Sequence, residues 1–248
     1  MFFGLLVIAI DGAGHRESVS GVLAEFVGAI AAGVALFLRQ LPQTSPLLPI
    51  DLLRIPLFAL SVATSICSFT AQMLAYVSLP FFFEGVLMHN AVDTGLLMTP
   101  WPLMTGLTAQ LAGRLADRYS AGLLGGIGML VFALGLSSLA LMPAHPGTAG
   151  IIWRMLICGF GFGMFQTPNN RAIISSAPRG RSGGASGMLG TARLLGQTVG
   201  AALVALVFSF FGAQATTIAL GAAAAIALFA AVVSFTRLLD RNGLAGSR

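Results

Sequence analysis

Long apolar runs alternate with short polar breaks along almost the whole chain. Seven runs are long enough to cross a bilayer, because a helix needs about 20 apolar residues to span a hydrocarbon core about 30 Å thick. Their approximate bounds are 19–39, 56–83, 93–113, 121–142, 150–173, 184–211 and 214–236. None shows the period-two alternation of a strand. The pattern predicts an all-α fold, a polytopic transmembrane helical bundle with seven complete spans.

The breaks between the runs suggest how the chain is divided. Residues 1–10 are apolar but only about half as long as a span, so we expect them to be a partial span whose beginning is missing. Residues 41–55 contain three prolines, and the stretch 47–55 has the pattern of an amphipathic segment lying at the membrane surface. The last six runs occupy 56–237, and 238–248 form a tail. The chain therefore reads as truncated at its front.

Composition makes the lipid bilayer the expected surroundings. The 248 residues are 56% hydrophobic and 8% charged, whereas about 25% of a soluble domain is charged. All 13 basic residues are arginine, and they are scattered between apolar runs instead of forming a phosphate-binding stripe. A soluble enzyme is thereby excluded, and we expect no nucleic-acid partner.

Arginine placement predicts the orientation in the membrane. Short cytoplasmic loops of membrane proteins are enriched in basic residues. If the spans alternate, the outer side holds only Arg16 and Arg154. The other side holds Arg39, Arg54, Arg114, Arg118, Arg171, Arg179, Arg181, Arg237, Arg241 and Arg248. We therefore expect a multi-pass protein of the cytoplasmic (inner) membrane with its C-terminus in the cytoplasm.

Polar side chains inside the spans are candidates for a transport pathway. A charge at mid-bilayer costs about 2.5–3.5 kcal/mol and normally faces protein or water. Arg193 is the tenth residue of the run 184–211, and Gln197 lies one helical turn further on. The runs 121–142 and 214–236 have almost no such residues, so we expect them to face lipid while the other four of the last six line a polar interior. The candidate pathway residues are Gln72, Tyr76, Met98, Trp101, Gln110, Arg154, Gln166, Asn170, Arg193 and Gln197.

Two alternatives stay open for these residues. Buried amides in membrane bundles also serve as hydrogen bonds between helices, and Arg154 is close enough to a span end to reach the interface. Glycine pairs four residues apart predict close helix packing at Gly159 and Gly163, at Gly183 and Gly187, and at Gly196 and Gly200. No nucleophile–base set and no cluster of metal ligands is present in the sequence, so we expect no enzyme activity, cofactor or metal.

One polar break is more specific. The loop GRLADR, with Gly113, Arg114, Asp117 and Arg118, resembles the loop between the second and third helices of each half of the major facilitator superfamily. It lies between the second and third of the last six spans, where the C-terminal half of that family carries it. The resemblance implies a gating role for these four residues, and Asp117 is placed to cap the next helix. Ser120 stands where the family pattern has glycine.

Other stretches narrow the resemblance. Gly159–Asn170, Arg181–Gly187 and Ala192–Ala202 are similar to the C-terminal half of fourteen-helix drug:proton antiporters, close to exporters of quaternary ammonium compounds. This implies that 56–237 form the C-terminal six-helix bundle and that 1–40 are the end of a central linker helix pair. It also implies small hydrophobic or cationic substrates, driven out by a proton gradient without a cofactor.

The same resemblance implies a partner. Alternating access needs two bundles around a central site, so the expected partner is the missing N-terminal half, and the chain alone is expected to be inactive. Two other functions remain open: a major-facilitator transporter of another solute, such as a sugar, peptide or siderophore, or a membrane scaffold that transports nothing.

Overall fold

The computed structural model describes residues 50–143, 146–178 and 180–245. Every regular element in these ranges is a helix, which confirms the all-α class for this part of the chain. The elements are η1 (Ile50–Arg54), α3 (Pro56–Gly85), α4 (Ala91–Met98), α5 (Pro100–Leu115), α6 (Ala121–Ala140), α7 (Thr148–Ser176), α8 (Ser182–Phe211), η2 (Gly212–Gln214) and α9 (Ala215–Ala245). The expected span 19–39, the linker pair in 1–40 and most of the connection 41–55 lie outside the described residues.

Within the described ranges, four helical segments are long and apolar enough to cross a membrane, namely Pro56–Gly85, Ala121–Ala140, Thr148–Ser176 and Ser182–Leu238. The last of them contains both α8 and α9, which are joined by the short helix η2. The predicted runs and the observed helices coincide to within a few residues at most ends. The exception is the C-terminus, where α9 continues to Ala245 and includes most of the predicted tail.

The predicted span 93–113 is divided into α4 and α5 at Thr99. Asn90 caps α4 by accepting a hydrogen bond from the Asp93 backbone N–H at 2.8 Å. Pro100 and Pro102 have no backbone N–H and cannot continue the helical ladder. Thr99 still donates to the Gly95 carbonyl at 3.1 Å, so α4 and α5 follow one another without a loop. The prolines thus interrupt the hydrogen bonding of this segment without turning the chain back.

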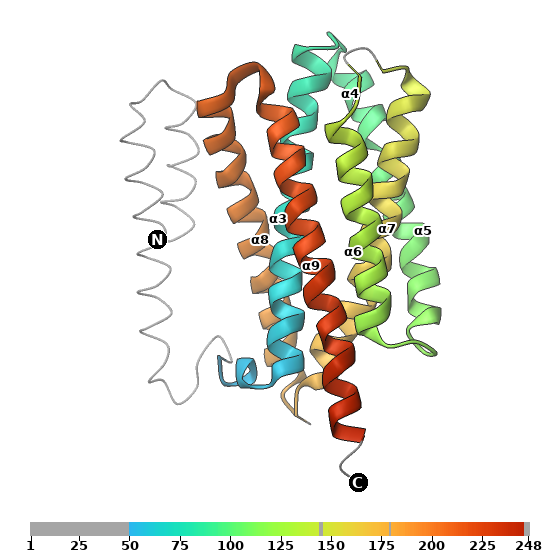
Figure 1. The fold of residues 1–248 in the computed structure, drawn as a ribbon, viewed down its shortest axis with the longest axis vertical. Coiled ribbons are helices and arrows are strands. Elements are labelled where there is room, and N and C mark those ends of the chain that lie inside the picture. Colours follow the sequence, from blue (N-terminus) through green and yellow to red (C-terminus); the bar gives the residue numbers. More distant parts are fainter. Residues whose placement is uncertain (1–49, 144–145, 179, 246–248) are drawn as a thin grey trace.

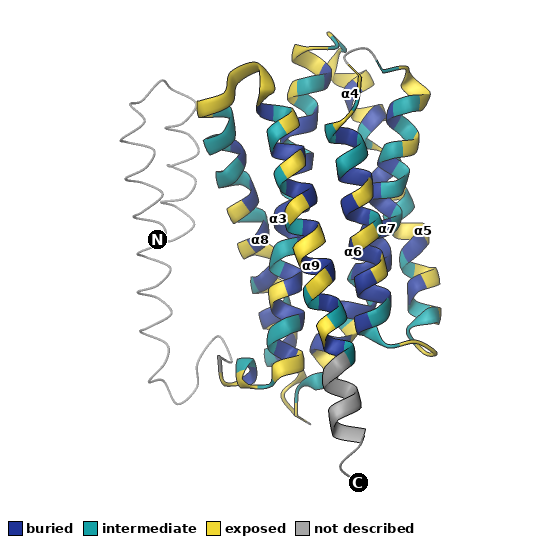
Figure 2. Cartoon of the chain, in the orientation of Figure 1, coloured by how far each residue is buried: buried dark blue, intermediate teal, exposed yellow. Residues whose placement is uncertain are grey.

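The helices lie side by side along the long axis of the molecule (Figure 1). α3 packs along α8 and α9, α6 packs along α7 and α9, and α5 packs along α7. Additional contacts between α3 and α7 close the middle of the bundle. Buried residues gather where the helices meet, while large apolar side chains such as Leu134 and Phe229 are exposed on the outside (Figure 2). This distribution suits a protein whose outer solvent is lipid.

Glycines let several of these helices touch through their backbones. A Cβ on Gly128 of α6 would lie 2.6 Å from the Phe165 nitrogen of α7, and one on Gly163 would lie 2.7 Å from the Thr105 oxygen of α5. Gly196 and Gly200 meet the α3 backbone in the same way. The predicted close packing is confirmed at these positions and at Gly159. At Gly183 and Gly187 a Cβ would meet none of the described residues within 4 Å, so the prediction stays a prediction there.

Candidate functional site

The GRLADR loop forms a tight turn at the arginine-rich end of the bundle, the same end as η1 and the α7–α8 loop (Figure 1). The backbone N–H of Arg118 and that of Tyr119 both donate to the Leu115 carbonyl, at 3.0 and 2.9 Å. Arg114 and Arg118 are exposed, and Gly113 is half-buried. The turn therefore points both predicted gating arginines away from the bundle.

Asp117 binds α7 instead of capping α6. Arg171 Nη1 donates to Asp117 Oδ1 at 2.6 Å. The α6 cap is Ser120, whose hydroxyl oxygen accepts from the Leu123 N–H at 3.3 Å. The predicted capping role of Asp117 is therefore wrong, because Ser120 occupies the N-cap position and leaves the carboxylate free to pair with Arg171. The GRLADR loop is therefore joined to the end of α7 by an ion pair.

A second ion pair at this end joins η1 to the start of α8. Arg181 donates through both terminal nitrogens to the Asp51 carboxylate, with Nη2 3.1 Å from Oδ1. The hydrogen bonds from Arg181 lower the pKa of Asp51, and those to Asp51 raise the pKa of Arg181. Leu52 of η1 is buried with Phe58 and Ile173. The described end of the predicted surface segment is thus packed on protein.

A buried polar cluster links three helices next to these ion pairs. Arg237 of α9 is only 3% exposed and donates through Nη1 to the Asn169 side-chain oxygen of α7 at 2.7 Å. Its Nη2 donates to the Thr64 hydroxyl of α3. Asn169 Nδ2 in turn donates to the Ser61 carbonyl at 3.1 Å and to the Ser65 hydroxyl at 2.8 Å. The cluster fastens α7 to both α3 and α9.

Sequence reasoning missed Arg237, because it placed this residue among the arginines of loops and helix ends. The structure buries its side chain. Ser61, Thr64 and Ser65 share one face of α3. This polar face, together with Asn169 inside another span, was the signal in the sequence for a buried polar cluster. Nothing local in the sequence connects either of them with residue 237.

The predicted pathway residues fall into three groups by exposure. Trp101 is fully buried, Gln110 and Arg193 are exposed, and the others are half-buried. The half-buried residues are Gln72, Tyr76, Met98, Arg154, Gln166, Asn170 and Gln197.

An aromatic chain connects several of them through the middle of the bundle. The Arg193 guanidinium of α8 lies 5.4 Å from the Phe69 ring centroid of α3, a cation–π geometry. Phe69 meets Phe162 of α7 edge-on at 5.5 Å. From Phe162 the contacts continue through Phe132 and Trp101 to Tyr76. The structure thus brings Arg193, Trp101 and Tyr76 into one connected set.

Arg154 binds the backbone at the opposite end of the bundle. Its Nε donates to the Ser138 carbonyl of α6 at 2.9 Å and its Nη1 to the Gly150 carbonyl at 2.6 Å. The guanidinium also lies 4.3 Å from the Trp153 ring centroid. These contacts fit an anchor of the α6–α7 connection.

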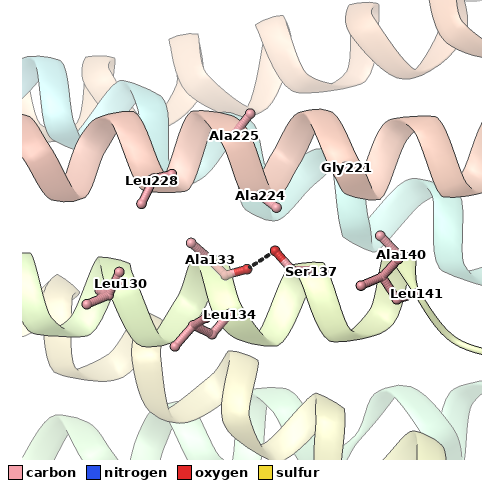
Figure 3. Close-up of a pocket in the computed structure, with 10 residues that line it drawn as sticks. All are labelled: Leu130, Ala133, Leu134, Ser137, Ala140, Leu141, Gly221, Ala224, Ala225 and Leu228. Carbon is pink, nitrogen blue, oxygen red and sulfur yellow. Dashed lines mark hydrogen bonds between the residues drawn. The ribbon is translucent and has the colours of Figure 1, made fainter.

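The bundle also carries a shallow apolar groove between α6 and α9, with a volume of about 390 Å³ (Figure 3). It is lined by leucines 130, 134, 141 and 228, by alanines 133, 140, 224 and 225, and by Ser137 and Gly221. None of the predicted pathway residues lines it. The groove lies on the two helices expected to face lipid. Among the described residues, no three His, Cys, Asp or Glu side chains are placed to hold a metal ion.

The comparison with known proteins agrees with this architecture. A family model for the Major Facilitator Superfamily matches residues 12–198 and 61–245 of the chain. The chain belongs to the major facilitator superfamily. Its helices and its similarity to transporters make it a multi-pass membrane protein. Members of this superfamily are transporters and generally not enzymes.

Curated relatives in the superfamily are transporters of different kinds. The uncharacterized transporter YebQ of Escherichia coli (strain K12) is 57% identical over 95% of this chain and 52% of its own length. The multidrug efflux pump LfrA of Mycolicibacterium smegmatis is 26% identical over 95% and 49%. The riboflavin transporter RibZ of Clostridioides difficile is 26% identical over 86% and 45%. The chain spans about half the length of the curated relatives it matches.

Proposed function

We propose that this chain is the C-terminal half of a drug:proton antiporter of the fourteen-helix type, which exports small hydrophobic or cationic compounds across the cytoplasmic membrane. The observation that carries the proposal is the GRLADR loop held to α7 by the Asp117–Arg171 pair, at the arginine-rich end of a helical bundle. The similarity to the multidrug efflux pump LfrA supports export of drugs. The arginine-rich end is then cytoplasmic, and so is the C-terminus.

A second bundle is part of this proposal. In major-facilitator transporters the solute site lies between two bundles that alternate in access. This chain matches about half of each relative, which supports one bundle here and a second one elsewhere. We therefore propose that the chain does not transport on its own and that the N-terminal half is its partner.

Proton coupling is assigned to that second bundle. The described acidic side chains lie near the two ends of the helices. Asp51 and Asp117 pair with arginines at one end, and Glu84 and Asp93 are exposed at the other. Between them the described bundle offers no carboxylate that could carry a proton through the membrane. A titrating carboxylate in the N-terminal half would supply this step without any cofactor.

The test is transport by the joined halves. The chain, fused to or co-expressed with the N-terminal half, is produced in a drug-sensitive bacterial strain, and ethidium efflux is measured with and without a protonophore. The chain expressed alone is the control. We expect efflux from the joined halves, its loss with the protonophore, and none from the chain alone. Efflux that ignores the protonophore would contradict antiport, and no efflux from well-expressed protein would contradict the substrate class.

One observation favours a different solute in the same family. Arg193 of α8, one of the expected pathway residues, is exposed, and its positive charge repels cations and attracts anions. The riboflavin transporter RibZ matches the chain at the same identity as the efflux pump. A ligand panel separates the two: binding of a polar, uncharged or anionic solute without binding of ethidium would favour the second function. Binding of neither by a folded two-bundle protein would favour the scaffold.

A further inference from the structure

The part of α7 before Pro168 and the part after it contact the rest of the bundle in different ways. Between Gly159 and Gly163 its backbone touches α5 and α6 directly. Pro168 then removes one backbone N–H from the helical ladder. From Asn169 to Ser176 the helix is held mainly by side chains, and we call this segment the α7 arm. A proline inside a helix is a common site of bending, so the position of the arm depends on those side-chain contacts.

Three contacts fix the α7 arm. Arg171 pairs with Asp117 of the gating loop. Ile173 is buried beside Leu52 of η1. Asn169 is bound by Arg237 and itself binds two groups of α3. The first of these contacts is largely exposed and the last is fully buried. Of the two polar contacts, that of Asn169 is therefore the one for which water does not compete.

Stability alone does not explain an arginine at position 237. Removing a guanidinium from water costs several kcal/mol, and an apolar side chain of similar volume usually fills such a site at lower cost. Among the side chains that the structure describes, no carboxylate pairs with Arg237 and none offers its buried Nε a hydrogen bond. What arginine supplies here is a planar group with several donors, which reaches α7 and α3 from α9 at once.

We propose that Arg237 is a positioning residue that acts through Asn169 to set the α7 arm, and thereby holds Arg171 within reach of Asp117. Asn169 of the buried cluster and Arg171, which binds the gating loop, are only two residues apart along α7. A shift of the helix at Asn169 therefore also moves Arg171. The proposal is independent of which solute is carried, and it does not require transport to be measured.

The experiment follows the arm directly. In the two-bundle protein, Cys67 and Cys158 are replaced by alanine and a single reporter is introduced as Ser175→Cys, at an exposed position on the arm. The rate of maleimide labelling in membrane vesicles is measured for Arg237→Met, Asp117→Asn and the double variant. Arg154→Met is the control, since this half-buried arginine of α7 binds two backbone carbonyls and the Trp153 ring at the far end of the bundle.

We expect Arg237→Met to raise the labelling rate about threefold or more, within the range of couplings seen inside one hydrogen-bond network. Asp117→Asn should raise it less, and it should add nothing in the double variant, because the ion pair is already lost when the arm moves. Arg154→Met should leave the rate unchanged. Labelling of Arg237→Met at the parental rate would overturn the proposal, and so would effects that simply multiply in the double variant.

A second pair of variants covers the case in which Arg237→Met does not fold. Asn169→Asp keeps an acceptor for Arg237 but loses the Nδ2 donor to α3, so it should label at a rate between those of the parent and Asn169→Ala. Asn169→Ala removes the acceptor and should label as fast as expected for Arg237→Met. Equal rates for these two variants would show that the contact between Asn169 and Arg237 does not position the arm.

Discussion

Arg171 and Asp117 are 54 residues apart in the chain, yet their side chains form an ion pair with 2.6 Å between Nη1 and Oδ1. Both side chains are more than half exposed, at 59% and 64%. Exposed ion pairs contribute only about 0–1 kcal/mol to stability. The pair is therefore better suited to holding the α5–α6 loop in one place than to stabilising the fold.

This distinction gives the first prediction. Asp117→Asn should lower ethidium efflux by the two-bundle protein about tenfold, the effect of about 1.4 kcal/mol on a rate. Its thermal unfolding temperature should stay close to that of the parent. The double variant Asp117→Arg with Arg171→Asp restores a pair of opposite charges and should recover much of the efflux. An unfolding temperature that falls in parallel with efflux would mean that the pair serves stability instead.

The glycine contacts give the second prediction. A Cβ at Gly161 would lie 2.8 Å from the Phe132 Cα and from the Gly128 oxygen, both in the α6 backbone, which cannot turn aside as a side chain can. Gly161→Ala should therefore destabilise the bundle by about 1–3 kcal/mol. Gly221→Ala, on the groove side of α9, meets nothing within 4 Å and should be neutral or slightly stabilising. Thermal unfolding in detergent compares the two, and equal effects would contradict direct backbone contact.

The third prediction concerns Asp51 and pH. Hydrogen bonding from Arg181 lowers the pKa of Asp51 below its ordinary value of 3.8. A lowered carboxyl pKa stabilises the folded arrangement above the ordinary value, and this contribution disappears as the pH falls through the folded value. Hydrogen exchange of the η1 amides should therefore lose protection below pH 3.8, after correction for intrinsic rates. Asp51→Asn should lack this step, and an unchanged profile in that variant would assign it to another group.

The fourth prediction tests Arg193 as a pathway residue. If a cationic substrate passes Arg193, removing the positive charge should lower the KM for ethidium about two- to tenfold, given the Coulomb energy at partly hydrated distances. The KM for an uncharged substrate should not change. Arg193→Gln is the test variant, and Arg154→Gln is the control at the far end of the bundle. An equal shift for charged and uncharged substrates would indicate a packing effect on Phe69 and not electrostatics.

Hydropathy predicted the helices well because lipid imposes one simple rule on each span. A segment such as 121–142 must be apolar along its whole length, whatever its neighbours are. The break at Thr99 within the predicted span 93–113 has a local cause, since Pro100 and Pro102 lack the backbone N–H that continues a helix. The glycine pairs predicted close packing correctly where another helix lies opposite, at Gly163 and Gly196. At Gly187 no described helix lies opposite, and spacing alone does not say where a partner helix is.

The site was less predictable because its contacts join distant parts of the chain. Arg237 and Thr64 are 173 residues apart, and no periodicity relates them. Arg237 looks like the basic residue that ends many membrane spans, and only the tertiary fold buries it. Asp117 was expected to cap α6, but Ser120 stands at the required position and accepts the bond. Local patterns predict local contacts, such as a helix cap. The pairing of Asp117 with Arg171 joins distant parts of the chain and follows only from the fold.

The contact between α6 and α7 has a consequence for how this bundle can change shape. At Gly128 and Gly161 the two backbones meet with no side chain between them. Sliding one helix along the other would drive each backbone into the next residue that carries a Cβ, so the pair resists shear. α6 and the part of α7 that precedes Pro168 should therefore move as one rigid body. Spin labels on these two helices would then keep one narrow distance distribution in every state of the transporter, while distances to the α7 arm change.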